Sequence, residues 1–187
     1  MKKLFLLVAI LFLWNGCSLA QKPYYNKEVS FVREIFNFHI VEPNVMRGSQ
    51  PSERALKLLK KYYGVKTILS LRDDRQVNER ERQIVEKLGM TFINIPMNPM
   101  KSQKPETIEQ SINIIRDKSN HPIFVHCQSG KDRIGMIFAA YRIKYDNWSY
   151  EDALMEMYAY GYDPIWCFKL KNSLDKWNAW RQNNSKK

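Results

Sequence analysis

Two units of helix, glycine and strand follow one another in the first half of the chain and limit the folds it can adopt. In the first unit, Ser52 is a typical N-cap, apolar residues recur at helical spacing up to Gly64, and residues 65–71 form a buried strand. In the second, the charged amphipathic segment 79–88 is followed, after a glycine, by a strand at residues 91–95. Strands separated by helices favour parallel pairing, because a parallel connection needs a crossover segment.

The rest of the chain continues this alternation. Helices are expected from Pro105, over residues 134–145, after the capping residue Ser149 and around residues 170–177, with a short apolar strand at residues 123–125. A length of 187 residues with 44% hydrophobic positions fits one domain. The sequence therefore predicts a single α/β domain with a largely parallel central sheet flanked by helices, whose ligand sites lie beyond the carboxyl ends of the strands.

The first twenty residues have the order of a bacterial secretory signal. Two lysines precede an unbroken apolar run at residues 4–14, and small residues follow. Cleavage after Ala20 would release a soluble chain, whereas cleavage before Cys17 with lipidation of its thiol would give a membrane-anchored lipoprotein. Either outcome predicts an exported protein, periplasmic or secreted, that meets a membrane only through Cys17.

The charge and the cysteine count exclude several classes of protein. Lysine and arginine total 30 against 19 acidic residues, a formal net charge of +11, so an anionic partner is expected. Three cysteines are too few for a disulfide scaffold. A nucleic-acid or membrane-surface binder would explain the charge, but no nucleic-acid motif is present and the basic residues are scattered. We expect a monomer that binds no nucleic acid.

One polar loop between a strand and a helix carries most of the reactive side chains. Residues 126–135 read His-Cys-Gln-Ser-Gly-Lys-Asp-Arg-Ile-Gly. The backbone N–H groups of a tight loop, together with the N-terminus of the next helix, favour a phosphate and also the thiolate form of Cys127, the nucleophilic form. Arg133 supplies a planar fork that can hold two phosphoryl oxygens. The expected phosphate-binding residues are Gln128, Ser129, Gly130, Lys131 and Arg133.

This loop resembles the signature of the cysteine-dependent protein tyrosine phosphatase superfamily, His-Cys, five residues and Arg. Residues 46–51 and 64–72 are similar to the front half of the compact dual-specificity-like phosphatases of bacteria, fungi and plants. The resemblance implies a dual-specificity-phosphatase-like fold, with a lead-in at residues 21–43, a phosphatase domain at residues 44–181 and a polar tail at residues 182–187.

The resemblance also implies a reaction. Cys127 would attack phosphorus to form a phosphocysteine, Arg133 would bind the phosphoryl group, and His126 would help to hold the loop and the thiolate. Neither a metal nor another cofactor is implied. The substrates would be phosphotyrosine or dual-specificity protein substrates, phosphoinositides or inositol phosphates. Low-molecular-weight phosphatases share the spacing from cysteine to arginine, but they carry it near the start of the chain.

The general acid is the first departure from the family pattern. Many relatives place an aspartate on a loop roughly thirty residues before the cysteine, where it protonates the leaving oxygen. Here that loop carries Asn98, which cannot donate in that way, so Asp132 is the better candidate. An equally good reading of Asp132 is an ion pair that orients Arg133. Asp73 and Asp74 are weaker candidates and are more simply solvated turn residues.

Ile134 is the second departure, because most relatives have a hydroxyl residue there that supports the thiolate as a leaving group. Its absence predicts slow dephosphorylation of the intermediate. Together with Asn98, it leaves open a weakly active or inactive relative that binds phosphorylated ligands, although pure binding does not need the thiol of Cys127. Cys167 is expected to be a small buried apolar residue, with a reversible disulfide to Cys127 as a minor alternative.

Overall fold

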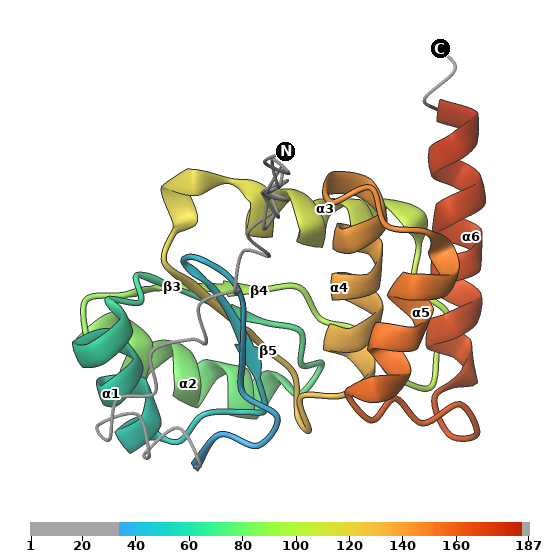
Figure 1. Ribbon diagram of the computed structural model, residues 1–187. Coiled ribbons are helices and arrows are strands. Elements are labelled where there is room, and N and C mark those ends of the chain that lie inside the picture. The colour runs from blue at the N-terminus through green and yellow to red at the C-terminus, as the bar shows by residue number, and fades with distance from the viewer. Residues whose placement is uncertain (1–33, 185–187) are drawn as a thin grey trace, which may run out of the picture.

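The computed structural model describes residues 34–184, which form a five-stranded sheet with helices on both faces (Figure 1). The strand order is β1-β2-β5-β3-β4, and only β1 runs antiparallel to its neighbour. The expected α/β domain with a largely parallel sheet is confirmed. The strands are β1 (His39–Glu42), β2 (Val45–Gly48), β3 (Thr67–Ser70), β4 (Thr91–Asn94) and β5 (Ile123–His126).

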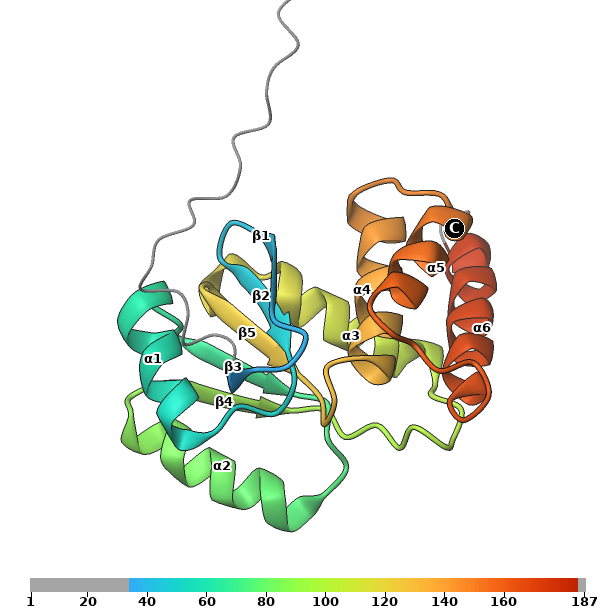
Figure 2. The same cartoon turned by 60° about the horizontal axis from the view of Figure 1, so that its bottom comes forward.

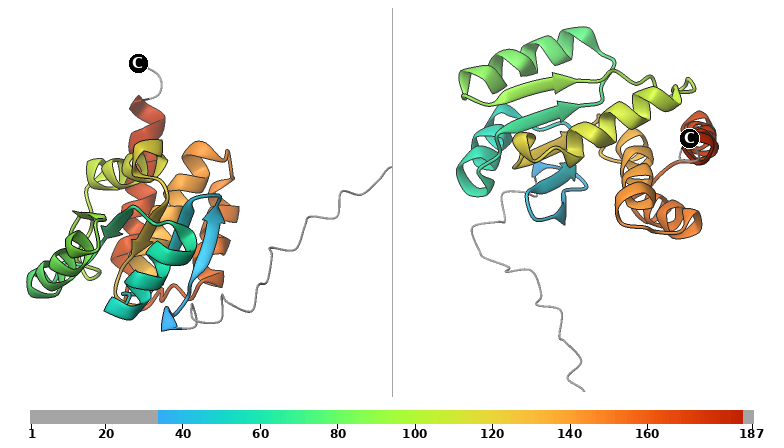
Figure 3. Two further views of the ribbon diagram at one scale, coloured as in Figure 1. Left: turned by 90° about the vertical axis from the view of Figure 1, so that its left-hand side faces the viewer. Right: turned by 90° about the horizontal axis from the view of Figure 1, so that it is seen from above.

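The helices divide between the two faces of the sheet, as Figure 3 shows. Helices α1 and α2 cover one face, and α3 to α6 gather on the other. Successive side chains of a strand point to opposite faces, so Phe124 of β5 belongs to the apolar cluster under α1 and α2 while Ile123 and Val125 belong to the larger one. The helices are α1 (Glu53–Tyr63), α2 (Arg75–Lys87), α3 (Pro105–Arg116), α4 (Asp132–Tyr145), α5 (Tyr150–Ala159) and α6 (Phe168–Asn184).

Capping residues set the helix ends. The Ser52 hydroxyl accepts from the backbone N–H of Ala55 at 3.1 Å, and Gly64 closes α1 in the left-handed region, both as expected. Helix α2 begins at Arg75, earlier than the expected residue 79, because the Asp74 carboxylate caps it. Asp74 is therefore an N-cap and not merely a solvated turn residue.

The amino-terminal boundary is earlier than expected. Ile35 is buried in the core and β1 pairs with β2, so the part of the expected lead-in from at least Ile35 belongs to the fold, and a domain start at residue 44 is too late. Helix α6 also continues to Asn184, inside the expected polar tail. The predicted export signal, including Cys17, lies outside the described residues. Among residues 34–184, none of the helices has the length and apolar character needed to cross a membrane.

Candidate active site

The loop that joins β5 to α4 lies at the edge of the sheet where the parallel strands end. This edge is at the bottom of Figure 1 and comes forward in Figure 2. Cys127 follows β5 directly and is buried, with 1% of its surface exposed. Two backbone hydrogen bonds fix the start of the loop, from Leu71 N to the His126 carbonyl at 2.9 Å and from Gln50 N to the Gln128 carbonyl at 3.2 Å. The expected nucleophile is thus held at the carboxyl end of a central strand.

Gly130 sits at the tightest point of this loop. Its φ is +71°, and a Cβ there would lie 2.7 Å from Ser49 N and 2.8 Å from the carbonyl carbon of Gly48. Only glycine tolerates both the left-handed backbone and this close approach. The Gly130 carbonyl accepts from Asn37 Nδ2 at 2.8 Å and from Arg47 Nη2 at 3.3 Å. These two hydrogen bonds hold the loop in place, and both donors come from residues distant from the loop in the sequence.

Arg47 is a buried cation below the loop. It comes from β2 and is 1% exposed, and its guanidinium carbon lies over the rings of Tyr160 and Phe138, 4.4 and 5.2 Å from their centres. Burial lowers the pKa of Arg47 to about 10, against the opposing effect of Glu156. The sequence alone predicts no role for Arg47 or Asn37. An arginine within a short, otherwise apolar segment is the one signal that could have suggested Arg47.

Arg133 is buried in the first turn of α4 and is already oriented. Its Nη1 donates to the Asp73 carboxylate at 3.0 Å and to the Met97 carbonyl at 3.2 Å. The carboxylate that orients Arg133 is therefore that of Asp73, and the prediction that Asp132 does so is wrong. Asp73 is likewise more than a solvated turn residue. This ion pair could not be predicted from the sequence, because Asp73 follows β3 and lies sixty positions before Arg133.

Asp132 instead faces the connection between α5 and α6. Its Oδ1 accepts from the backbone N–H of Asp163 at 2.9 Å, and its carboxylate lies beside the thiol of Cys167. Burial, followed by the charge of Asp132, raises the pKa of the Cys167 thiol to about 11. Cys167 is buried, as expected, and both Cys127 and Cys167 are free. A thiol that resists ionisation is a poor partner for disulfide exchange with Cys127.

His126 is fully buried behind the nucleophile. Its Nδ1 lies 3.2 Å from the Cys127 carbonyl, and its Nε2 lies 3.1 Å from Oε1 of the buried Glu81, at an angle outside hydrogen-bond geometry. Glu81 comes from α2, so the imidazole is enclosed between the loop and that helix. This position suits a residue that supports the loop and does not touch a substrate.

The remaining expected residues have varied surroundings. Gln128 is exposed and Ser129 half-buried at the loop surface. The Lys131 ammonium lies 5.3 Å from the centre of the Phe36 ring. The Asn98 side chain accepts from Met100 N at 2.9 Å, so it stabilises its own turn. Ile134 is fully buried in the core.

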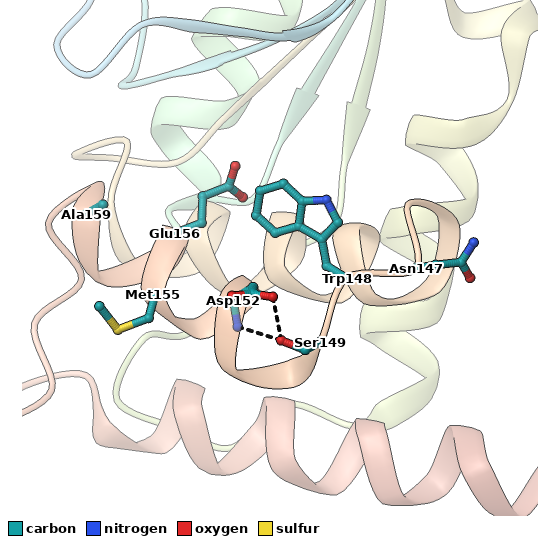
Figure 4. Close-up of a pocket in the computed structure, with 7 residues that line it drawn as sticks. All are labelled: Asn147, Trp148, Ser149, Asp152, Met155, Glu156 and Ala159. Carbon is teal, nitrogen blue, oxygen red and sulfur yellow. Dashed lines mark hydrogen bonds between the residues drawn. The ribbon is translucent and has the colours of Figure 1, made fainter.

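A separate groove of about 700 Å³ lies on the outer side of α5 (Figure 4). Trp148, Asp152, Met155 and Glu156 line it, and the Ser149 hydroxyl bonds to both the N–H and the carboxylate of Asp152 at its edge. No residue of the β5–α4 loop contributes to this lining. Among residues 34–184, no group of three or more histidine, cysteine or acidic side chains is placed to hold a metal ion.

Comparison with known proteins gives several relatives of similar kind. The dual specificity protein phosphatase TpbA of Pseudomonas aeruginosa strain UCBPP-PA14 is 24% identical over 126 residues, 67% of this chain and 55% of the relative. Inositol diphosphatase DSP4 of Arabidopsis thaliana is 33% identical over 64 residues, 34% of this chain and 28% of the relative. The chain thus matches about half or less of the length of these relatives.

Solved structures of low sequence identity share the fold. The core catalytic domain of the PP-IP phosphatase SIW14 from S. cerevisiae, crystallised with citrate, superposes with a TM-score of 0.65 at 20% identity, over 80% of this chain and 94% of that one. The structure of P. aeruginosa TpbA gives 0.64 at 20% identity, over 75% and 84%. The model of the tyrosine phosphatase family matches residues 32–164, which is more than half of the chain and includes the whole β5–α4 loop. This chain therefore belongs to the tyrosine phosphatase family.

Proposed function

We propose that the protein hydrolyses phosphate monoesters through a phosphocysteine intermediate. The observation that carries the proposal is the joint placement of Cys127 and Arg133 in one loop at the carboxyl edge of the sheet, with Arg133 already oriented by Asp73. A thiol beside a helix N-terminus is suited to nucleophilic attack, and a guanidinium is suited to a phosphoryl group. The relatives, described as dual specificity and inositol phosphatases, support the same class of reaction.

Two balanced steps account for the reaction. In the first, the Cys127 thiolate bonds to phosphorus while the bond to the ester oxygen breaks, and Asp132 gives its proton to the leaving oxygen. In the second, water attacks the phosphocysteine, the sulfur leaves as thiolate, and Asp132 takes the proton of the water. The guanidinium of Arg133 and the loop N–H groups stabilise the charge on the three equatorial oxygens in both steps. His126 contributes by supporting the loop.

The range of substrates is tested with a panel on purified wild-type protein. The panel contains a phosphotyrosine peptide, phosphoinositides in vesicles and soluble inositol phosphates, and released phosphate is measured. We expect turnover of at least one member and a phosphate adduct on Cys127 after rapid acid quench, found by mass spectrometry. Binding of these ligands without any turnover would contradict the proposal and favour the second candidate, a phospho-ligand-binding module, which Asn98 in place of an acid motivates.

Asp132 is expected to act as the general acid, since it directly precedes Arg133 in the loop sequence and its Oδ1 is fixed by the backbone N–H of Asp163. Asp132→Asn should lower kcat/KM by roughly 10²-fold for a poor alkyl leaving group and much less for p-nitrophenyl phosphate, which needs no proton. Asp73→Asn is the matched control. It should lower kcat/KM for both substrates by a similar factor, because it disturbs the orientation of Arg133. If Asp73→Asn instead lowered kcat/KM only for the poor alkyl leaving group, Asp73 would be the general acid.

Ile134 is expected to slow breakdown of the intermediate, because its buried side chain offers no hydroxyl to the departing thiolate. Stopped-flow measurement with p-nitrophenyl phosphate should show a burst of product followed by slower turnover. Ile134→Thr should shrink the burst and raise the steady rate. An absent burst, with turnover unchanged by the substitution, would contradict this expectation.

We also propose that the protein acts outside the cytoplasm, in the periplasm or after secretion. The basic, apolar and small-residue order of residues 1–20 supports export. Mass measurement of the mature amino terminus distinguishes the two routes, since lipidation would leave a modified Cys17 and simple cleavage would leave Gln21. An unprocessed terminus in an intact cell would contradict export.

A further inference from the structure

The connection between α5 and α6 forms one wall of the β5–α4 loop. Asp163 in this connection donates its backbone N–H to Asp132, the neighbour of Arg133. Gly161 packs against the Lys131 side chain, since a Cβ there would lie 3.3 Å from Lys131 Cδ. Figure 2 shows the two loops at the same edge of the molecule. The α5–α6 connection therefore lies directly against the loop that is expected to hold the phosphate.

Two large apolar side chains stand exposed on this connection. Ile165 is 80% exposed and Trp166 is 68% exposed, the greatest exposed fractions among the large apolar side chains of residues 34–184. An exposed tryptophan leaves a large apolar area in water, and rigid aromatic side chains are frequent contact residues in binding sites. We name Ile165 and Trp166 the apolar wall.

The backbone that presents the apolar wall is held firmly. The Asp163 carboxylate accepts from the N–H groups of both Ile165 and Trp166, at 2.9 and 3.0 Å. The Tyr162 hydroxyl donates to the Cys167 carbonyl at 3.0 Å, and Cys167 N donates to the Asp163 carbonyl at the same distance. Because the turn is fixed before a ligand arrives, contact with the wall costs little additional ordering.

A second exposed ring lies beside Lys131 of the loop. Phe36 is 59% exposed and lies under the ammonium of Lys131, whose carbon chain packs on Gly161. The Lys131 ammonium thus lies over an aromatic ring, and this part of the loop surface presents apolar carbon from Phe36 and from the Lys131 chain. Such surroundings suit a phosphate carried by an aromatic ring better than one carried by a polyhydroxylated or polyphosphorylated ring.

We propose that the apolar wall contacts the phosphate-bearing ring of aryl phosphomonoesters, so that Ile165 and Trp166 determine a preference for phosphotyrosine over phosphoserine in peptides. This inference rests on the proposed function and deepens it, because it assigns the preference to the α5–α6 connection. Trp166 supplies the larger contact. Its indole faces the ring of the substrate and takes no part in proton transfer.

The test is binding of two peptides of identical sequence that carry either phosphotyrosine or phosphoserine. Titrations use the Cys127→Ser background, in which the peptides persist, and compare Trp166 with Trp166→Ala. We expect the ratio of the two dissociation constants to fall roughly tenfold in Trp166→Ala, the size of one aromatic contact, with phosphoserine affinity nearly unchanged. Trp166→Phe should restore most of the ratio. Met155→Ala, at a side chain 66% exposed in the separate groove of Figure 4, should leave it unchanged.

An unchanged ratio in Trp166→Ala would overturn the inference even if the wild type hydrolyses both peptides. Conversely, a wild type without turnover but with ring-dependent binding would contradict the proposed function and retain the apolar wall. Cosedimentation with phosphatidylcholine–phosphatidylserine vesicles supplies a further arm. If Trp166→Ala abolishes vesicle binding and leaves the peptide ratio intact, the wall is a membrane-binding surface and the inference is wrong.

Discussion

Replacing Cys127 by serine is expected to lower kcat/KM for a phosphotyrosine peptide by on the order of 10⁴-fold or more. The thiolate is a strong nucleophile near neutral pH, whereas a serine hydroxyl in the same place keeps its proton and has no base aligned to remove it. The change replaces one atom in a side chain that is 1% exposed, so the loop should keep its shape. Released phosphate is the measurement, with the wild type assayed in parallel.

Two observations separate lost chemistry from lost structure in this experiment. The serine variant should still bind the phosphotyrosine peptide, because the loop N–H groups and Arg133 remain. Its dissociation constant for the peptide should be similar to the inhibition constant that the same peptide shows as a competitive inhibitor of the wild type. Cys167→Ser removes the other free thiol of residues 34–184, and it should retain activity to within several-fold. Full activity in Cys127→Ser, or a phosphate adduct on another residue, would show that Cys127 is not the nucleophile.

The contiguous parts of the site could be predicted from the sequence, and the parts brought by other elements could not. Cys127, Gly130 and Arg133 lie within seven residues, and local order alone places them between a strand and a helix N-terminus. Asn37 and Arg47 reach the Gly130 carbonyl across 93 and 83 positions of sequence, which only the strand order brings together. The spacing of residues within a single sequence does not reveal the order of the strands in the sheet.

Strand β2 shows the same limit in the fold. Its four residues are all buried in the interior of the sheet, so they lack the alternation that marks a half-exposed strand, and one of them is Arg47. Helix ends that are marked by a serine cap or by a following glycine can be predicted from the sequence, because these signals are local. The start of α2 at Arg75 is harder to predict, because the sequence around its cap, Asp74, also fits a turn.

Arg133→Lys is the second change with a large expected effect, a loss of roughly 10²–10³-fold in kcat with a smaller change in KM. A lysine carries the same charge but presents a single ammonium, so it cannot hold two phosphoryl oxygens as their charge develops. The arrangement around Arg133 sharpens this expectation. Its Nη1 already bonds to Asp73 and Met97, which fixes the orientation of the planar guanidinium, and a single ammonium cannot be oriented in this way.

The matched control for this change is Arg142→Lys on the same helix. Arg142 is also largely buried, with ion pairs to Asp146 at 2.8 Å and Glu156 at 3.1 Å, but it lies more than two turns of α4 beyond the loop. Its substitution should lower stability without a comparable loss of kcat. Inhibition by vanadate, whose five-coordinate geometry resembles the transition state, should weaken strongly in Arg133→Lys alone. Equal losses of kcat in the two variants would mean that the loss reflects a disturbed α4, and the role assigned to the Arg133 fork would be wrong.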